Sequence, residues 1–233
     1  SASGILPVKE PVTRYFHFGI IWGLFLLAVV PYVAWETVAT MRHRPWGRRE
    51  VALAVGIPMI PLGLWVMAPF VLRALVETGL PFLPEELREL AIQILTWDLS
   101  QMHVLLWRRF VHLLPLLVLM AAAVYALLRR QRAEEGPAGA FPLLLLAMGF
   151  LLLIGPELFY VVDLFSNRMN SIFKLYYQVW VLLALASSYA IYYLSVRYAR
   201  SGPVLRVVGY AWIAVLGVAL LNVRQSDATF MSS

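Results

Sequence analysis

The sequence contains no cysteine. Disulfides, thiolate metal sites, iron–sulfur clusters and thioether-linked haem are therefore excluded from this chain. Charge is also scarce, because only 14% of the residues are charged, against about 25% in soluble domains. This shortage excludes a soluble globular enzyme, a disordered chain and a nucleic-acid-binding domain.

Apolar residues dominate instead, at 61% of the sequence, with a mean hydropathy of +0.76. A helix needs about 20 apolar residues to cross the hydrocarbon core of a bilayer. Runs close to this length cover residues 15–35, 51–71, 110–128, 141–161, 173–194 and 204–222. Lipid satisfies no backbone polar group, and these runs lack the short alternation of barrel strands, so each is expected to be a helix. We therefore predict an all-α protein, a polytopic transmembrane helix bundle of about six spans.

The segment 81–101 differs from the runs on either side of it. Pro84 and the acids after it are typical of a helix N-terminus, and Trp97 is an interfacial anchor. An amphipathic helix on the membrane surface fits this pattern, and a loop helix packed on the bundle fits it nearly as well. We expect one membrane domain over residues 1–233. Because the chain begins at Ser1 rather than Met and ends abruptly, we also expect it to be part of a longer protein.

Charge divides unevenly between the two sides of the predicted bundle. One side holds ten arginines, including Arg42, Arg130 and Arg197, and four acids, which gives a net charge of +6. The other side holds nine basic and nine acidic residues. Cytoplasmic loops carry the excess of basic residues. We therefore predict that the protein lies in the cell membrane with its +6 side in the cytoplasm. Both termini of the chain would then be extracytoplasmic.

Polar and ionisable residues are concentrated between the fourth and fifth predicted spans. Ionisable residues at membrane depth are costly and usually line a cavity or pair with one another. The spacing of four, three and four between Asp163, Asn167, Asn170 and Lys174 predicts one stripe on a helix. Glu157 and Tyr160 extend it backward, and Tyr177 and Gln178 extend it forward. The candidate binding residues are Glu157, Asp163, Asn167, Arg168, Asn170, Lys174, Tyr177 and Gln178.

Two interpretations of this stripe stay open. Lys174 and Arg168 suit a phosphate, and the amides and tyrosines suit sugar hydroxyls, so the stripe can bind a polar or anionic group. It can also consist of structural ion pairs, Asp163 with Lys174 or Glu157 with Arg168, that close the loop between two spans.

The histidines offer weaker chemistry. His112 lies inside the third predicted span and could ligate a tetrapyrrole, although a histidine hydrogen-bonded within the bundle is the commoner case. The sequence contains no zinc motif and no nucleotide-binding loop. We therefore predict no metal site, and the sequence leaves the cofactor unknown.

The block Asn167-Arg168-Met169-Asn170 with the following Phe173-Lys174 and Tyr176-Tyr177-Gln178 resembles the Chlor_Arch_YYY family, very hydrophobic multi-pass proteins with no established activity. That family is similar to the GT-C glycosyltransferase superfamily. The resemblance implies sugar transfer from a polyprenyl-phosphate donor on the outer side of the membrane. It also implies an essential carboxylate in the first extracytoplasmic loop, which has no counterpart here, so the block carries over a binding role at most.

Three hypotheses about function follow from these observations. The first is a GT-C-like membrane protein that binds membrane lipids, among them a polyprenyl-phosphate sugar, with the catalytic residues unassigned. The second is a non-enzymatic subunit that scaffolds a larger complex with other membrane subunits. The third is a pigment or haem subunit that uses His112.

Overall fold

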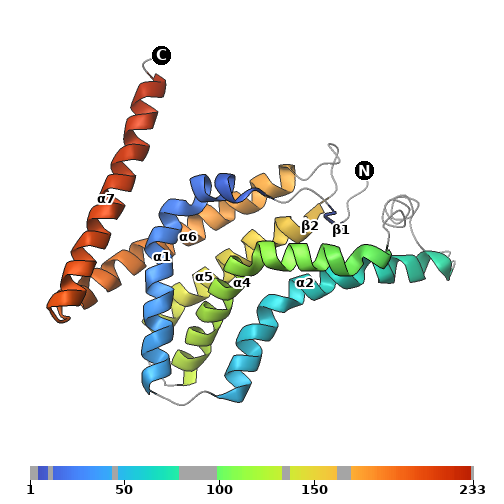
Figure 1. Ribbon diagram of the computed structural model, residues 1–233, viewed down its shortest axis with the longest axis horizontal. Helices are drawn as coiled ribbons and strands as arrows, with labels where there is room; N and C mark the ends of the chain where they lie inside the picture. Colours follow the sequence, from blue (N-terminus) through green and yellow to red (C-terminus); the bar gives the residue numbers. More distant parts are fainter. Residues whose placement is uncertain are drawn as a thin grey trace.

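The computed structural model describes residues 5–9, 13–43, 47–78, 99–132, 137–161 and 169–231. This part of the chain contains six α-helices, one 3₁₀ turn and two short strands (Figure 1). The helices are α1 (Tyr15–His43), α2 (Arg48–Glu77), α4 (Met102–Arg132), α5 (Pro137–Leu158), α6 (Met169–Ala199) and α7 (Pro203–Met231). The remaining elements are η1 (Leu99–Gln101), β1 (Ile5–Pro7) and β2 (Phe159–Val161).

Five of these helices, α1, α2, α4, α5 and α6, are long and apolar enough to cross a membrane. The apolar part of α7 is shorter and covers Pro203–Ala219. The predicted all-α membrane bundle is confirmed in this form, with five long spans and one shorter apolar helix. Nearly all of segment 81–101 lies outside the described residues, so the interfacial helix stays a prediction.

Helix α5 forms the centre of the bundle and packs against both α4 and α6. Leu146, Phe150, Leu153 and Ile154 are fully buried and recur at intervals of three and four residues, which places them on one face. Helix α2 packs on α4, and α1 packs on both α4 and α6. Helix α7 leans away from the other helices beyond the turn that joins it to α6 (Figure 1).

A proline in α1 fixes the place where α7 is attached. Pro31 has no amide hydrogen, so the carbonyl of Leu27 lacks its helical donor. The indole of Trp212 on α7 donates a hydrogen bond to this carbonyl at 2.8 Å. The proline thus creates an acceptor that a neighbouring helix satisfies.

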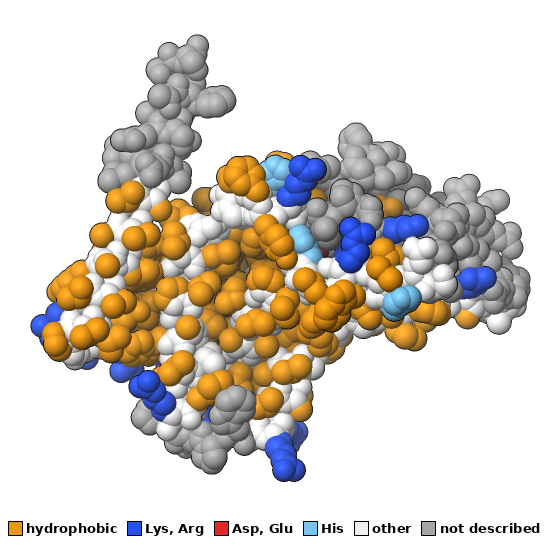
Figure 2. Space-filling view, in the orientation of Figure 1, with side chains coloured by type: hydrophobic (Ala, Val, Ile, Leu, Met, Phe, Trp, Pro, Cys, Tyr) orange, Lys and Arg blue, Asp and Glu red, His pale blue; other side chains and the backbone are white. Residues whose placement is uncertain are grey.

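The surface of the bundle has an apolar middle and basic side chains toward its edges, as expected for a membrane protein. Figure 2 shows hydrophobic side chains across the middle of one face, with Lys and Arg toward its lower and left edge and again at its upper right. We call the lower-left end, where α1 meets α2, α4 meets α5 and α6 meets α7, the basic end. The opposite end carries β1, β2 and the starts of α1, α4 and α6 (Figure 1).

A two-stranded antiparallel sheet at this opposite end was not expected from the sequence. Strand β1 pairs with β2 so that Ile5 faces Val161 and Pro7 faces Phe159. The expectation that a span continues to residue 161 is therefore wrong, because α5 ends at Leu158. The expectation that Tyr160 extends a helical stripe backward is wrong for the same reason: strand β2 separates Glu157 from α6.

Candidate functional site

A buried arginine holds the strand end of the bundle together. The Arg109 side chain on α4 is only 5% exposed. It donates hydrogen bonds to three carbonyls: Glu157 at 2.7 Å, Val8 at 2.9 Å and Lys9 at 2.6 Å. Its guanidinium lies 5.5 Å above the ring of Trp65, whose indole also donates to the Val8 carbonyl. We call Arg109 and these four partners the arginine clasp.

The clasp joins α2, α4, the end of α5 and the segment after β1. A buried guanidinium is costly unless its donors are used, and carbonyl oxygens take that role here. The sequence analysis missed this residue because Arg108 and Arg109 both look like interfacial anchors at the edge of a span. Only the rotation of α4 distinguishes them, since Arg108 is exposed and Arg109 is buried.

Glu157 is buried beside the clasp, with 4% of its surface exposed. Its carboxylate accepts hydrogen bonds from the backbone amide and the hydroxyl of Thr13, at 3.0 and 2.5 Å. Glu157 therefore attaches the segment that leads into α1 to the end of α5. Its predicted partner Arg168 lies outside the described residues, so that ion pair stays a prediction.

An apolar cavity of about 160 Å³ lies between α1 and α4 next to this carboxylate. Its walls are formed by Phe18, Leu26, Leu113, Leu116 and Leu119. At one end it meets four groups with polar atoms: Thr13, Tyr15, His112 and Glu157. The cavity thus combines a hydrocarbon interior with a polar end.

Proline again explains the local geometry. Pro115 lines the cavity and removes the amide that would bond to the carbonyl of Val111. The hydroxyl of Tyr15 lies 3.4 Å from this carbonyl and donates to the carbonyl of His112 at 2.9 Å. The rings of Tyr15 and His112 stack with centroids 4.5 Å apart. The start of α1 is therefore held against α4 at the polar end of the cavity.

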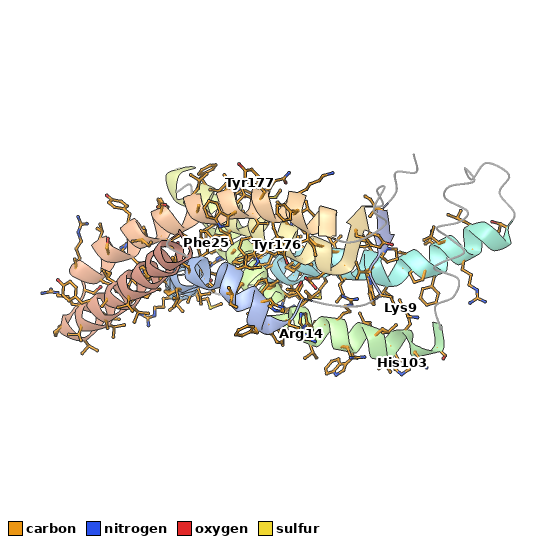
Figure 3. The ribbon with its side chains drawn as sticks, turned by 90° about the horizontal axis from the view of Figure 1, so that it is seen from above. Lys9, Arg14, Phe25, His103, Tyr176 and Tyr177 are labelled. Carbon is orange, nitrogen blue, oxygen red and sulfur yellow. The ribbon has the colours of Figure 1, made fainter. Side chains whose placement is uncertain are left out.

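Two exposed arginines lie close in sequence to residues that line this polar end. Arg14 is exposed and lies between Thr13 and the first residue of α1. Arg108, also exposed, precedes His112 by four residues, which places both on one side of α4. Figure 3 shows Arg14 beside α4 where α1 begins, with Lys9 farther along the same side. The cavity lining itself carries the Glu157 carboxylate, so these arginines would offset its charge and favour an anion only outside the lining.

The predicted stripe on α6 lies elsewhere. Lys174, Tyr177 and Gln178 are exposed and, with Phe173, line a shallow depression. Tyr176 points toward α1, where its ring lies 5.1 Å from that of Trp22, whereas Tyr177 points away from it (Figure 3). The structure therefore does not place these α6 side chains at the cavity that Glu157 lines.

Several other members of the predicted set are not described. Asp163, Asn167 and Arg168 lie outside the described residues. Asn170 lies in the first turn of α6, where only the backbone is described. The continuity of the stripe from Asp163 to Lys174 stays a prediction.

Residues 1–183 match the model of the uncharacterized membrane protein family DUF2298. The chain belongs to this family. It is an integral membrane protein with five long spans. The DUF2298 match covers the arginine clasp, the cavity and the first half of α6, and ends before α7. The chain matches no curated protein and no solved structure.

The pigment hypothesis finds little room at His112. Sites for ligands of drug size have volumes of roughly 300–1,000 Å³. The cavity beside His112 is about 160 Å³. Among the described residues, no group of three or more His, Cys, Asp or Glu side chains could hold a metal ion. An absorbance spectrum of the purified protein tests this hypothesis directly, since bound haem would give a Soret band.

Proposed function

We propose that this DUF2298 protein binds a long-chain isoprenoid lipid, with part of the chain in the cavity between α1 and α4. The observation that carries the proposal is an apolar cavity with a polar end, next to which the exposed Arg14 and Arg108 occur in sequence. An apolar cavity of about 150 Å³ can hold one benzene molecule. The cavity here, at about 160 Å³, therefore has room for roughly one isoprene unit. A longer chain would continue along the exposed apolar surface into the bilayer.

The polar end suits a phosphorylated head group. Arg14 and Arg108 offer guanidinium groups, which bind phosphate in bidentate geometry. Glu157 and Thr13 offer oxygen atoms that accept hydrogen bonds from sugar hydroxyls. These groups support a polyprenyl-phosphate sugar as the ligand. They agree with the resemblance to the Chlor_Arch_YYY family and, through it, to GT-C glycosyltransferases.

The α6 residues belong to the same proposal as a second contact region. Lys174, Tyr177 and Gln178 would contact the head group of a lipid that approaches α6. Asp163, Asn167, Arg168 and Asn170 would complete that region. The chain lacks the acidic loop of GT-C enzymes, so catalysis would need another segment or another chain.

The proposal includes an orientation in the cell membrane. The basic end would face the cytoplasm, because arginine-rich loops are retained there. The cavity mouth and both termini would then be extracytoplasmic. This is the side on which GT-C enzymes use polyprenyl-phosphate donors.

A pair of matched leucines on α4 tests the binding site. Leu119 lines the cavity and Leu127 does not, and both are half-buried leucines of the same helix. We expect Leu119→Trp to fill the cavity and exclude at least two chain carbons. Losing the burial of two methylene groups costs about 1.6 kcal/mol, or roughly tenfold in affinity.

The measurement is retention of polyprenyl phosphate by the purified full chain in native mass spectrometry, in competition with phosphatidylglycerol. Leu127→Trp should retain the lipid as the unmodified chain does. Arg14→Gln should weaken binding of polyprenyl phosphate but not of uncharged polyprenol. Equal retention by the Leu119 and Leu127 variants would show that the chain does not use this cavity.

One observation favours the scaffold function as a second candidate. Lys174, Tyr177 and Gln178 leave polar atoms exposed on a membrane-spanning helix, and a partner chain could cover them. Photocrosslinking from position 177 in native membranes distinguishes the two functions. Crosslinks to lipid support lipid binding at α6, whereas a protein adduct of one defined mass supports a scaffold.

A further inference from the structure

The basic end of the bundle presents positive charge without an exposed acid among the described residues. Glu36 and Glu50 are only 2% and 3% exposed. Glu36 lies 2.6 Å from the guanidinium of Arg130, and Glu50 lies 4.0 Å from that of Arg129. Both acids are thus directed to internal partners. The arginines that remain exposed at this end are Arg42, Arg48, Arg49, Arg197, Arg200 and Arg206.

Four of these arginines lie on the helices that form an aromatic cluster where α1, α6 and α7 meet. The ring of Tyr198 on α6 packs edge-on against Trp35 of α1, with centroids 5.7 Å apart. It also contacts the ring of Trp212 on α7 at 6.1 Å. Trp and Tyr rings are enriched at the depth of lipid head groups. The three rings therefore mark a place where one head group could be held.

Glycine at position 209 makes this contact possible. A Cβ atom at Gly209 would lie 2.5 Å from the Cβ of Tyr198, closer than the two atoms can approach. The absence of a side chain lets the Tyr198 ring lie directly on α7. Helix α7 is in this way held close to α6 at the basic end, before it leans away from the bundle (Figure 1).

Helical spacing directs the arginines to the same place. Arg42 follows Trp35 by seven residues, two turns of α1, and so lies on the face that contacts Tyr198. Arg206 precedes Gly209 by three residues and lies on the face of α7 that meets Tyr198. Arg197 and Arg200 flank Tyr198 on α6, at the turn into α7. We call these four arginines and the three rings the basic corner.

We propose that the basic corner binds the phosphate of an anionic phospholipid. Exposed arginines from three helices lie at this junction, with Arg197 over the ring of Tyr193 and Arg206 donating to the carbonyl of Ser201. Arginine is the side chain best suited to bind phosphate through two hydrogen bonds. Basic pockets between spans are known sites for acidic head groups. The exposed apolar side chains of α7, Val208, Val215 and Val218 among them, would contact the acyl chains. This site lies at the other end of the bundle from the isoprenoid cavity and is independent of it.

Two double variants with the same change in charge test the proposal. Arg42→Gln/Arg206→Gln removes charge from the basic corner. Arg48→Gln/Arg49→Gln removes two exposed arginines at the start of α2, outside the corner. Losing a charge-assisted hydrogen bond to a bound phosphate weakens binding about tenfold or more. We expect the corner variant to retain phosphatidylglycerol at least about tenfold more weakly, and the control variant, which loses no such bond, to retain it nearly as the unmodified chain does.

The probe is phosphatidylglycerol in competition with phosphatidylcholine, measured by native mass spectrometry of the full chain. Inorganic phosphate is added in a parallel arm. The proposal predicts preferential retention of phosphatidylglycerol that phosphate does not displace. Equal losses in the two variants would reveal a diffuse charge effect and overturn the site. Displacement by phosphate alone, or equal retention of both lipids by the unmodified chain, would overturn the assignment to an anionic lipid.

Tryptophan fluorescence provides a second readout that does not depend on mass. Phosphatidylglycerol with brominated chains should quench the unmodified chain more than Arg42→Gln/Arg206→Gln. The control double variant should be quenched as strongly as the unmodified chain. Equal quenching of all three proteins would contradict the proposal. Both variants change only exposed side chains, so an unchanged unfolding temperature identifies correctly folded protein.

Discussion

Replacing Arg109 with methionine should release β1 from the bundle while the helices stay folded. The substitution removes the Arg109 donors to the carbonyls of Val8, Lys9 and Glu157, while the indole of Trp65 still donates to Val8. A hydrogen bond to a charged group contributes about 1.5–3 kcal/mol. Three such bonds, offset by several kcal/mol for burying the guanidinium, leave a net loss of about 3 kcal/mol.

Hydrogen exchange measures this loss where it occurs. The amide of Val8 donates to the carbonyl of Leu158 at 2.8 Å, so it is protected only while β1 stays paired. A loss of about 3 kcal/mol should accelerate its exchange roughly 150-fold. Amides in the middle of α5 should exchange at their original rates. In Arg109→Lys, the Val8 amide should exchange at a rate between those of the unmodified chain and Arg109→Met. One ammonium group cannot reach three carbonyls as a planar guanidinium can.

The neighbouring arginine provides the control. Arg108→Met changes the same residue type on the same turn of α4, but at an exposed position. Exposed substitutions away from such contacts usually change stability by less than about 0.5 kcal/mol. If Arg108→Met released β1 as strongly as Arg109→Met, or if Arg109→Met left Val8 protected, the clasp would not be the cause of the strand's stability.

Four further predictions follow from the same structure. A cysteine replacing Gln131 should react with an impermeant reagent only after cells are opened, and labelling of intact cells would reverse the proposed orientation. Trp212→Phe should destabilise the protein by about 1–3 kcal/mol, since it leaves the Leu27 carbonyl without a donor. The loss should shrink in a Pro31→Ala background, where the restored amide supplies the donor, and a double-mutant cycle in thermal unfolding measures the difference. Burial raises the pKa of the Tyr160 phenol above its ordinary value, so Tyr160→Phe should remove a phenolate absorbance step above about pH 10. The unfolded phenol ionises first, so the stability that this burial carries is complete below about pH 10 and is lost as pH rises through the folded pKa. The purified chain alone should transfer no sugar from a panel of polyprenyl-phosphate donors, and sustained transfer would contradict the need for a further acidic segment.

The helices were predictable because a long apolar run in a bilayer must satisfy its backbone hydrogen bonds within itself, whatever its neighbours. The sequence therefore located the spans well, up to their ends. It failed at residues 159–161, where the apolar run continues but the backbone leaves α5 and pairs with β1. That pairing depends on a partner more than 140 residues away, which no local pattern reveals.

The site was less predictable for a related reason. The arginine clasp joins residues from four separate segments, and neither Arg109 nor Trp65 stands out from the anchors near it. The α6 stripe is inferred from spacing on one helix, and the structure describes that helix from Met169 onward. The charge count treats Glu36 and Glu50 as ordinary charges of the predicted cytoplasmic side. The structure buries both beside Arg130 and Arg129, so each acid is paired with an arginine of the same end and neither offsets the arginines that are exposed there.

The pairing of β1 with β2 has a consequence for the order of events during synthesis. Ile5 leaves the ribosome roughly 150 residues before Val161, an interval of about 8–30 s at rates of about 5–20 residues per second. Throughout that interval, the segment that becomes β1 has no strand to pair with, and α4 is made before the Glu157 carbonyl that Arg109 binds. The pairing of β1 with β2 therefore follows the synthesis of α1, α2, α4 and α5. A translational pause or a chaperone that acts before residue 157 emerges would work on an arginine that still lacks one of its three carbonyl partners.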